Sequence, residues 1–257
     1  MSKVEIFKNP PKVKHKEIPP EINKEEIIKT IESRRSVRVF SNEEVLYEDM
    51  KKCLELAVLA PNSSNLQPWE FYWVRDNQKK EALKKYCLSQ PAATTAPELI
   101  VCVARTDTWK RNNKLMLNHF KKTDKYIPKA ALQYYKKIVP IAYNQGPFGL
   151  IGLIKKITLS IMGVKQPTPR QPTSYSDMRV WAHKSAALAC ENLMLSLRAF
   201  GYDSCPMEGM DSKRIQKLLQ LPNKAEICMV ISAGKRAENG IYGKRIRFDN
   251  SLFIKEI

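Results

Sequence analysis

Two stretches decide how this chain is interpreted, Arg34-Arg35-Ser36-Val37-Arg38 and Ala60-Pro61-Asn62-Ser63-Ser64-Asn65-Leu66-Gln67-Pro68-Trp69. The first places three guanidinium groups and a hydroxyl at the end of a segment with helical spacing. The second is a run of small amide and hydroxyl side chains that leads into an apolar strand. Guanidinium groups bind a phosphate well, and small polar side chains suit a polyhydroxylated chain with a flat polar ring. We therefore predict a site for flavin mononucleotide (FMN); the alternatives are a solvated arginine cluster and an ordinary polar loop.

A third stretch, Pro206-Met207-Glu208-Gly209, completes a pattern that resembles the three signature regions of the nitroreductase family. The stretches occur in the family's order, and the resemblance covers roughly residues 24–104 and 181–250. It implies an α+β fold with a mixed sheet flanked by helices, in an intertwined homodimer. Outside it lie an extended N-terminal arm, 1–23, and residues 105–180. We expect the latter to be an inserted basic helical segment within a single domain over 24–257.

The resemblance also assigns roles to the arginine stretch. Arg34, Arg35 and Ser36 would hold the phosphate and the ribityl chain of FMN. Arg38 would be the catalytic residue, because a cation near N1 and the C2 carbonyl stabilises the negative charge of the reduced ring. The alternative is a helix C-terminus decorated with cations that complement its dipole.

Other residues would complete the cofactor site by the same resemblance. In the family the second stretch crosses the dimer interface, so part of it would serve the partner's flavin, and a backbone N–H of the third stretch would face flavin N5. Gln90 is a candidate for the flavin pyrimidine, and Arg245, with Lys244 as second candidate, for the phosphate. A turn and a solvated basic tail are the alternatives for the last two stretches. The expected additional cofactor-binding residues are Asn62, Ser63, Ser64, Asn65, Gln67, Gln90, Pro206, Met207, Glu208, Gly209, Lys244 and Arg245.

The implied activity is that of an FMN-dependent oxidoreductase that passes electrons from NAD(P)H to a small organic acceptor such as a nitroaromatic or a quinone. The chain has no Gly-x-Gly-x-x-Gly turn, which argues against a Rossmann dinucleotide site. Two alternatives keep the same fold. One is a dehalogenase-like enzyme, which we disfavour because residues 75–97 hold no Glu/Tyr/Lys lid. The other is a flavin-binding module without turnover.

Charge suggests a rival of another class. The 257 residues carry a net charge of +18, and residues 105–170 hold 14 lysines and arginines against Asp107 and Asp124, a net +12. Such a field attracts anions, including a dinucleotide, nucleic acid or an acidic membrane. Nucleic acid is disfavoured, because the sequence lacks stacked-aromatic RNA motifs and zinc-finger spacing.

Cysteine and histidine usage bears on the compartment and on metals. The six cysteines are far apart, and we interpret them as thiols in a reducing compartment, which favours a cytoplasmic protein. The N-terminus has no apolar core of a signal peptide. The three histidines lack ligand-like spacing, so we expect no metal.

Periodicity predicts the main elements. Ser41-Asn42-Glu43-Glu44 resembles a capping box that opens the second helix, and Gly201 would end the longest one. A buried strand is expected at Leu99–Ala104. The other expected helices are Lys24–Glu32, 77–88, Trp181–Phe200 and Ser212–Leu219, and the other expected strands are Phe71–Val74, Tyr202–Cys205 and Ile227–Ala233.

An apolar stretch, Pro147–Val164, lies within the basic region. Lys155 and Lys156 at its centre argue against a membrane-spanning helix, because each costs about 2.5–3.5 kcal/mol there. A helical stripe nevertheless runs through Leu150, Leu153, Ile154, Ile157 and Ile161. It suits a core or dimer-packing helix, a lid over the flavin, a partner-facing helix, or a helix in peripheral contact with a membrane.

Overall fold

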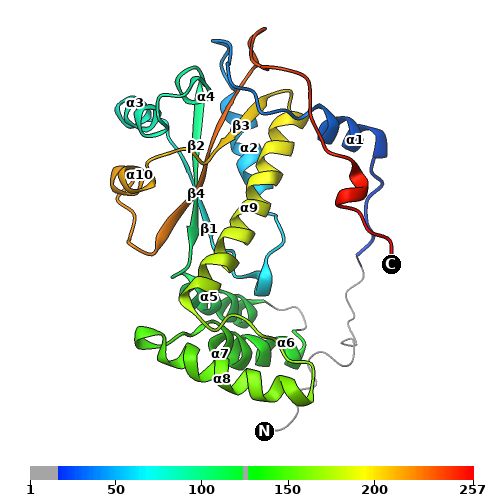
Figure 1. Cartoon of the computed structure of the whole chain (residues 1–257), viewed down its shortest axis with the longest axis vertical. Helices are drawn as coiled ribbons and strands as arrows, with labels where there is room; N and C mark the ends of the chain where they lie inside the picture. The colour runs from blue at the N-terminus through cyan, green and yellow to red at the C-terminus, as the bar shows by residue number, and fades with distance from the viewer. Residues whose placement is uncertain (1–16, 124–126) are drawn as a thin grey trace.

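The computed structural model describes residues 17–123 and 127–257 (Figure 1). Its centre is a four-stranded sheet in the order β1-β2-β4-β3. The strands are β1 (Trp69–Trp73), β2 (Glu98–Arg105), β3 (Asp203–Met207) and β4 (Ala225–Gly234), and all three pairings are antiparallel. The mixed sheet that we expected is therefore antiparallel. Its one parallel pairing among the described residues is an isolated bridge between Ser36 and Ser204.

Strand β2 organises the core because it is buried along the whole expected run Leu99–Ala104. Side chains of a strand alternate between its faces. Ile100, Cys102 and Ala104 belong to one hydrophobic cluster, and Leu99, Val101 and Val103 belong to the other. A continuous apolar run is thus the expected sequence of a strand covered on both sides.

Helices cover the two faces of the sheet differently (Figure 1). The first cluster includes residues of α2 (Tyr47–Ala57) and α9 (Tyr175–Ala199). The second includes residues of three shorter helices, α3 (Asn77–Tyr86), α4 (Pro91–Thr94) and α10 (Ser212–Leu218). This arrangement of helices around an antiparallel sheet is the predicted α+β class.

The long helix α9 is fixed at both ends by local chemistry. Ser174 caps it, accepting a hydrogen bond of 3.0 Å from the N–H of Asp177. Gly201, with φ of +81°, follows the helix in the left-handed conformation that glycine adopts without strain. The Gly201 stop confirms the prediction, whereas the cap starts the helix six residues before the expected Trp181.

The capping box predicted at Ser41 is wrong, because α2 begins at Tyr47. The Ser41 N–H donates instead to the Lys235 carbonyl at 2.8 Å. Phe40 forms a bridge with Arg236, so this segment stays extended beside the exit of β4. Helix α1 (Lys24–Ser33) forms as predicted. Residues 17–23 before it have no helix or strand, and the rest of the expected arm lies outside the described residues.

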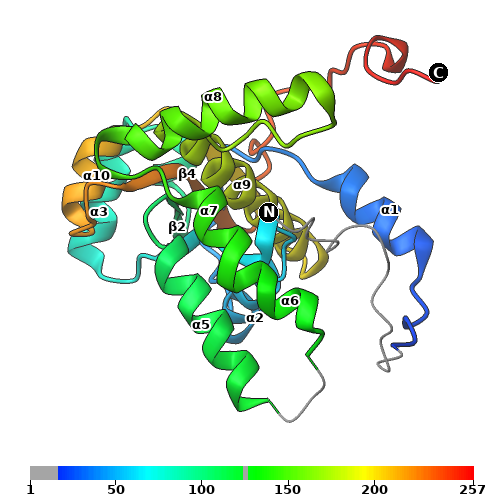
Figure 2. The ribbon, with the colours of Figure 1, turned by 90° about the horizontal axis from the view of Figure 1, so that it is seen from below.

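Between β2 and α9 the chain forms a group of helices at one end of the molecule (Figures 1 and 2). Short 3₁₀ turns, η2 (Ser63–Asn65) and η5 (Asn250–Leu252), lie outside this group. Its members are α5 (Trp109–Lys122), α6 (Lys129–Gln133), the π-helical turn η3 (Tyr134–Ile138), α7 (Val139–Tyr143), the 3₁₀ turn η4 (Pro147–Gly149) and α8 (Leu150–Lys165).

Candidate cofactor site

The arginine stretch and the C-terminal tail enclose a basic cavity of about 240 Å³. After α1 the chain is extended, and the N–H of Val37 donates to the Ser204 carbonyl at 3.1 Å. The N–H of Arg38 donates to the Gly240 carbonyl at 2.8 Å. Val37 is thereby buried between β3 and the tail. The cavity is lined by Arg34, Arg35, Ser36, Arg38, Ile241, Tyr242, Gly243, Lys244, Arg245, Ile246 and Arg247.

The arginines of this cavity are held by carbonyls and a ring. The Arg35 guanidinium donates to the Gly243 carbonyl at 2.6 Å, and Arg245 donates to the Arg34 carbonyl. The Arg38 guanidinium lies 5.5 Å from the centre of the Tyr242 ring. These contacts join two segments that are some two hundred residues apart in the sequence.

The cavity carries positive charge that no carboxylate of the described residues pairs with. Among residues 17–123 and 127–257, none of its six lysines and arginines forms an ion pair. Clustered cations repel one another and attract an anion into the space between them. The donor set of guanidinium groups and one hydroxyl therefore fits a phosphate group.

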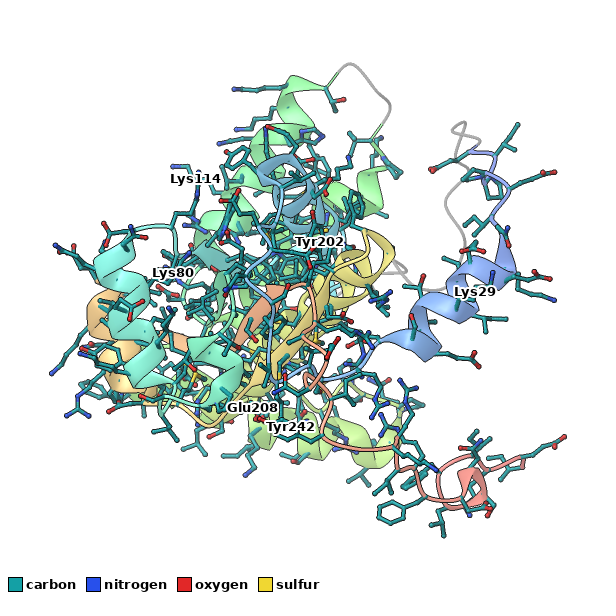
Figure 3. All side chains as sticks on the ribbon, turned by 90° about the horizontal axis from the view of Figure 1, so that it is seen from above. Lys29, Lys80, Lys114, Tyr202, Glu208 and Tyr242 are labelled. Atoms are coloured by element: carbon teal, nitrogen blue, oxygen red, sulfur yellow. The ribbon has the colours of Figure 1, made fainter. Side chains whose placement is uncertain are left out.

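The third stretch adjoins this cavity. Pro206 and Met207 are the last residues of β3, two residues beyond the predicted strand end, and the exposed Glu208 and Gly209 leave it. Burial raises the pKa of the neighbouring Cys205, and the positive charges of Arg38 and Arg34 oppose that rise. A bridge between Ser36 and Ser204 places the arginine stretch beside β3 (Figure 3, where Glu208 and Tyr242 are labelled).

Gln90 contacts the third stretch through its side-chain amide. Its Nε2 donates to the Gly209 carbonyl at 3.0 Å and to the Cys87 carbonyl at 2.9 Å. The preceding residues Leu88 and Ser89 have φ of +59° and +49°, a conformation that few non-glycine residues adopt. The tight turn therefore presents Gln90 to the loop after β3.

The second stretch lies elsewhere, beside the helices between β2 and α9. The Ser63 hydroxyl is 3.1 Å from the Tyr143 hydroxyl, and the Ser64 hydroxyl is 2.6 Å from that of Tyr134. Tyr135 donates to the Ser64 carbonyl at 3.0 Å. The two serines are therefore engaged by tyrosines, and neither lines the basic cavity.

The amides of the second stretch stabilise its own turn and border a larger cleft. Asn62 accepts a hydrogen bond of 2.7 Å from the N–H of Gln67. Asn65 and Gln67 line a cavity of about 1000 Å³ between α2 and α5, and none of residues 34–38 lines it. A single chain therefore does not bring Asn65 and Gln67 to the basic cavity.

The sequence analysis missed five of the residues that line the cavity, and two of these, Tyr242 and Arg247, have side chains that bear on its charge. A signal for Arg247 was present, because residues two apart point the same way in an extended segment and Arg245 was a candidate. Tyr242 gives no comparable signal, since it precedes the basic tail and its contact with Arg38 is long-range.

Outside the basic cavity, the thiols of Cys102, Cys190 and Cys228 lie close enough to interact with one another in the described part of the chain. No group of three or more His, Cys, Asp or Glu side chains there is arranged to hold a metal ion. All six cysteines are free thiols. Burial raises the pKa of Cys53 and of Cys87 to about 12, so both thiols remain protonated at neutral pH.

Comparison with known proteins agrees with this fold. The profile of the Nitroreductase family matches residues 31–235. The chain is 30% identical to Protein DrgA of Synechocystis over 84% of this chain and 86% of DrgA. It is 27% identical to an NADH dehydrogenase of Thermus thermophilus, over 83% and 88% of the two chains.

A solved structure has a similar fold. It is the complex of a candidate nitroreductase of Exiguobacterium sibiricum with FMN, with a TM-score of 0.60 and 21% identity. The match covers 90% of this chain and 97% of that one. At this identity the likeness concerns the fold.

Proposed function

The chain belongs to the nitroreductase family, and we propose that it is an FMN-dependent oxidoreductase that passes electrons from NAD(P)H to a small organic acceptor. The observation that carries the proposal is the cluster of cations in the basic cavity, which has no carboxylate partner among the described residues. The FMN held by the Exiguobacterium protein and the name of the Thermus relative support the two cofactors. Nitroaromatics and quinones are the acceptors that we expect.

Different residues of the cavity would bind different parts of FMN. Arg34, Arg35 and Arg245 would bind the phosphate, and the Ser36 hydroxyl would hydrogen-bond to the ribityl chain. The Gln90 amide holds the Gly209 carbonyl and so orients the backbone from which an N–H would face the flavin ring. FMN, when bound, supplies the redox chemistry, accepting electrons from NAD(P)H and passing them to the acceptor.

Arg38 would tune that chemistry through its charge. A guanidinium remains protonated throughout the physiological range, so it needs no proton transfer to stabilise the anionic reduced ring. Tyr242 lies against Arg38 and limits the positions that this exposed side chain can take. We therefore assign Arg38 to the flavin potential and the other arginines to cofactor affinity.

A second copy of the chain would complete the site. The basic cavity, at about 240 Å³, is smaller than the roughly 300–1,000 Å³ typical of ligand pockets. The flavin-edge stretch, Asn62–Gln67, lies away from it in the same chain. Exposed apolar side chains on α1 and on the tail, including Ile31 and Phe253, suit burial against a partner. We propose a homodimer in which each subunit contributes Asn62–Gln67 to its partner's flavin.

The compartment that we propose is the cytoplasm. Six unpaired cysteines, most of them buried, suit a reducing environment better than an oxidising one. Reduction of the bound flavin by NAD(P)H likewise requires a supply of reduced nicotinamide cofactor. A flavin module without turnover would bind FMN in the same cavity but would fail this reduction.

The test is FMN affinity in matched arginine variants. We expect Arg34→Ala and Arg35→Ala each to weaken FMN binding about tenfold or more, since a charge-assisted hydrogen bond contributes about 1.5–3 kcal/mol. Arg214→Ala, which removes an equally cationic side chain from the surface of α10, should leave affinity unchanged. Equal affinity in all three variants would remove the basic cavity from the cofactor site.

A further inference from the structure

Helix α8 turns an apolar stripe toward solvent. Ile154, Ile157 and Ile161 are 64%, 55% and 66% exposed, and Leu150 and Val164 extend the stripe at its two ends. The spacing of these residues places them on one side of an α-helix. Pro147–Lys165 is long and apolar enough for a membrane helix by length and composition, yet only 6% of it is buried. The core-helix interpretation of this stretch is thus wrong for the isolated chain.

The opposite side of α8 is small or polar and faces the protein. Gly152 is buried, and a Cβ there would come within 2.3 Å of the Thr173 carbonyl oxygen. A Cβ on Gly163 would come within 2.1 Å of the Arg170 guanidinium. The helix therefore docks through its glycines, and its isoleucines are left outside.

Lys155 belongs to the inward side. Its amine donates to the Ala142 carbonyl at 2.7 Å and to the Pro172 carbonyl at 3.1 Å, and burial lowers its pKa. One of the two lysines that argued against a membrane-spanning helix is thus removed from the exposed surface. Lys156 and Lys165 remain exposed, at the flank and the end of the stripe.

The surroundings of the stripe are cationic. Helix α8 carries three lysines and no acidic residue. Between residues 108 and 176 the sequence has one acidic residue, Asp124, among more than ten basic ones. A cationic flank beside an apolar stripe matches the anionic headgroups and acyl chains of a bilayer surface.

Phe148 adds an aromatic side chain at the start of the stripe. It is 97% exposed and has φ of +51°, a conformation that bulky residues rarely adopt. The turn that precedes α8 therefore holds a large apolar ring away from the protein. Aromatic side chains in such positions are frequent at membrane interfaces.

From these observations we propose that α8 lies in the plane of an anionic lipid surface, with Phe148, Ile154, Ile157 and Ile161 inserted among the acyl chains. Sixteen residues of helix span about 24 Å, less than the roughly 30 Å of a bilayer core, and the glycine side remains attached to the protein. The helix therefore rests on the membrane and does not cross it. The inference is independent of FMN.

The position of α8 disfavours a lid over the basic cavity of the same chain. Helix α9 begins beside α8 and ends beside α1, which delivers the arginine stretch (Figures 1 and 2). Its 25 residues correspond to about 37 Å. The stripe is therefore far from that cavity, on the outer edge of the molecule.

The test is sedimentation of the full-length protein with vesicles. We expect binding to vesicles of equal parts phosphatidylglycerol and phosphatidylcholine, weaker binding to phosphatidylcholine alone, and weakening by salt. The combined variant Ile154→Ser, Ile157→Ser, Ile161→Ser should bind the anionic vesicles at least about tenfold more weakly. The matched control, Ile18→Ser, Ile22→Ser, Leu46→Ser, removes three exposed apolar side chains outside α8 and should bind within about twofold of the native chain.

Several results would overturn the proposal. One is a native chain that does not bind anionic vesicles at low salt, and another is equal binding by the native chain and the α8 variant. A variant that loses self-association in sedimentation velocity without vesicles would assign the stripe to a second copy of the chain. Displacement of the native chain from vesicles by duplex DNA, with the α8 variant binding that DNA equally well, would assign the region to nucleic acid.

Discussion

Replacing Arg38 with Ala should lower the reduction potential of the bound flavin. The proposed role of Arg38 is to place a positive charge beside N1 and the C2 carbonyl of the reduced ring, where negative charge develops. Removal of that charge destabilises the reduced form relative to the oxidised one. The reductive half-reaction with NAD(P)H should slow in consequence.

The magnitude follows from the exposure of Arg38. Two unit charges 4 Å apart interact by about 1 kcal/mol in water and about 4 kcal/mol near a protein surface. The Arg38 side chain is exposed, with Tyr242 on one side, so the lower part of that range applies. About 1–2 kcal/mol corresponds to a fall of about 20–40 mV for a two-electron couple, since 30 mV is about 1.4 kcal/mol.

The assay is a redox titration of the holoprotein against a reference dye. Arg38→Lys keeps the positive charge. The reduction potential of its flavin should therefore stay within about 10 mV of the native potential. Arg214→Ala is the control for loss of a cation outside the cavity. A native potential and a native reduction rate in Arg38→Ala would refute the assignment of Arg38.

Three further results are expected. Asp203→Ala should lower the thermal stability, because the buried carboxylate accepts a 2.6 Å hydrogen bond from Arg236. Each hydrogen bond to a charged group contributes about 1.5–3 kcal/mol. A melting temperature equal to that of the native protein would contradict this. Burial raises the pKa of Asp177, but the hydrogen bonds from Thr173 outweigh burial and lower it. The stabilisation that Asp177 provides is therefore present at neutral pH and lost as the pH falls below about 4. Asp177→Asn should reduce this loss of stability at acidic pH, as measured by urea unfolding at several pH values. Removal of residues 248–257 should shift the holoprotein toward monomer in sedimentation velocity, and a dimer of native stability would exclude the tail from the interface.

The sequence predicted the elements that a continuous local pattern of residues identifies. The run Leu99–Ala104 is apolar at every position because both faces of β2 are covered, and it is observed as a strand. Gly201 ends α9 because only a left-handed residue fits there. Local chemistry of this kind needs no knowledge of distant segments.

Predictions failed where a distant segment decides the local structure. Ser41 has the residues of a capping box, but its N–H is taken by the Lys235 carbonyl almost two hundred residues away. Propensity is a weak guide when such tertiary contacts compete with it.

The candidate site was only partly predictable, because contacts between distant segments also form it. Arg35 was identified from its neighbours, but its contact with Gly243 joins opposite ends of the chain and could be expected only from the family resemblance. The turn at Asn62–Gln67 has positive φ angles at Ser64, Asn65 and Gln67. No composition rule predicts that conformation for serine or glutamine.

The exposure of α8 shows a different limit of prediction from the sequence. The stripe of Ile154, Ile157 and Ile161 was evident from the helical spacing, but spacing does not say what covers an apolar face. The direction of Gly152 and Lys155 toward the protein settles which side is outward. That direction is a property of the packed helix and is absent from the pattern.

The most direct test of the central claim is an anaerobic titration of the purified protein with NADH and NADPH, followed by flavin absorbance. The account predicts a yellow protein with noncovalently bound FMN that at least one of the two donors reduces and that a quinone or nitroaromatic reoxidises. A colourless protein that added FMN cannot reconstitute would contradict the cofactor site. A yellow protein that neither donor reduces would contradict the enzymatic role while leaving the FMN site in place.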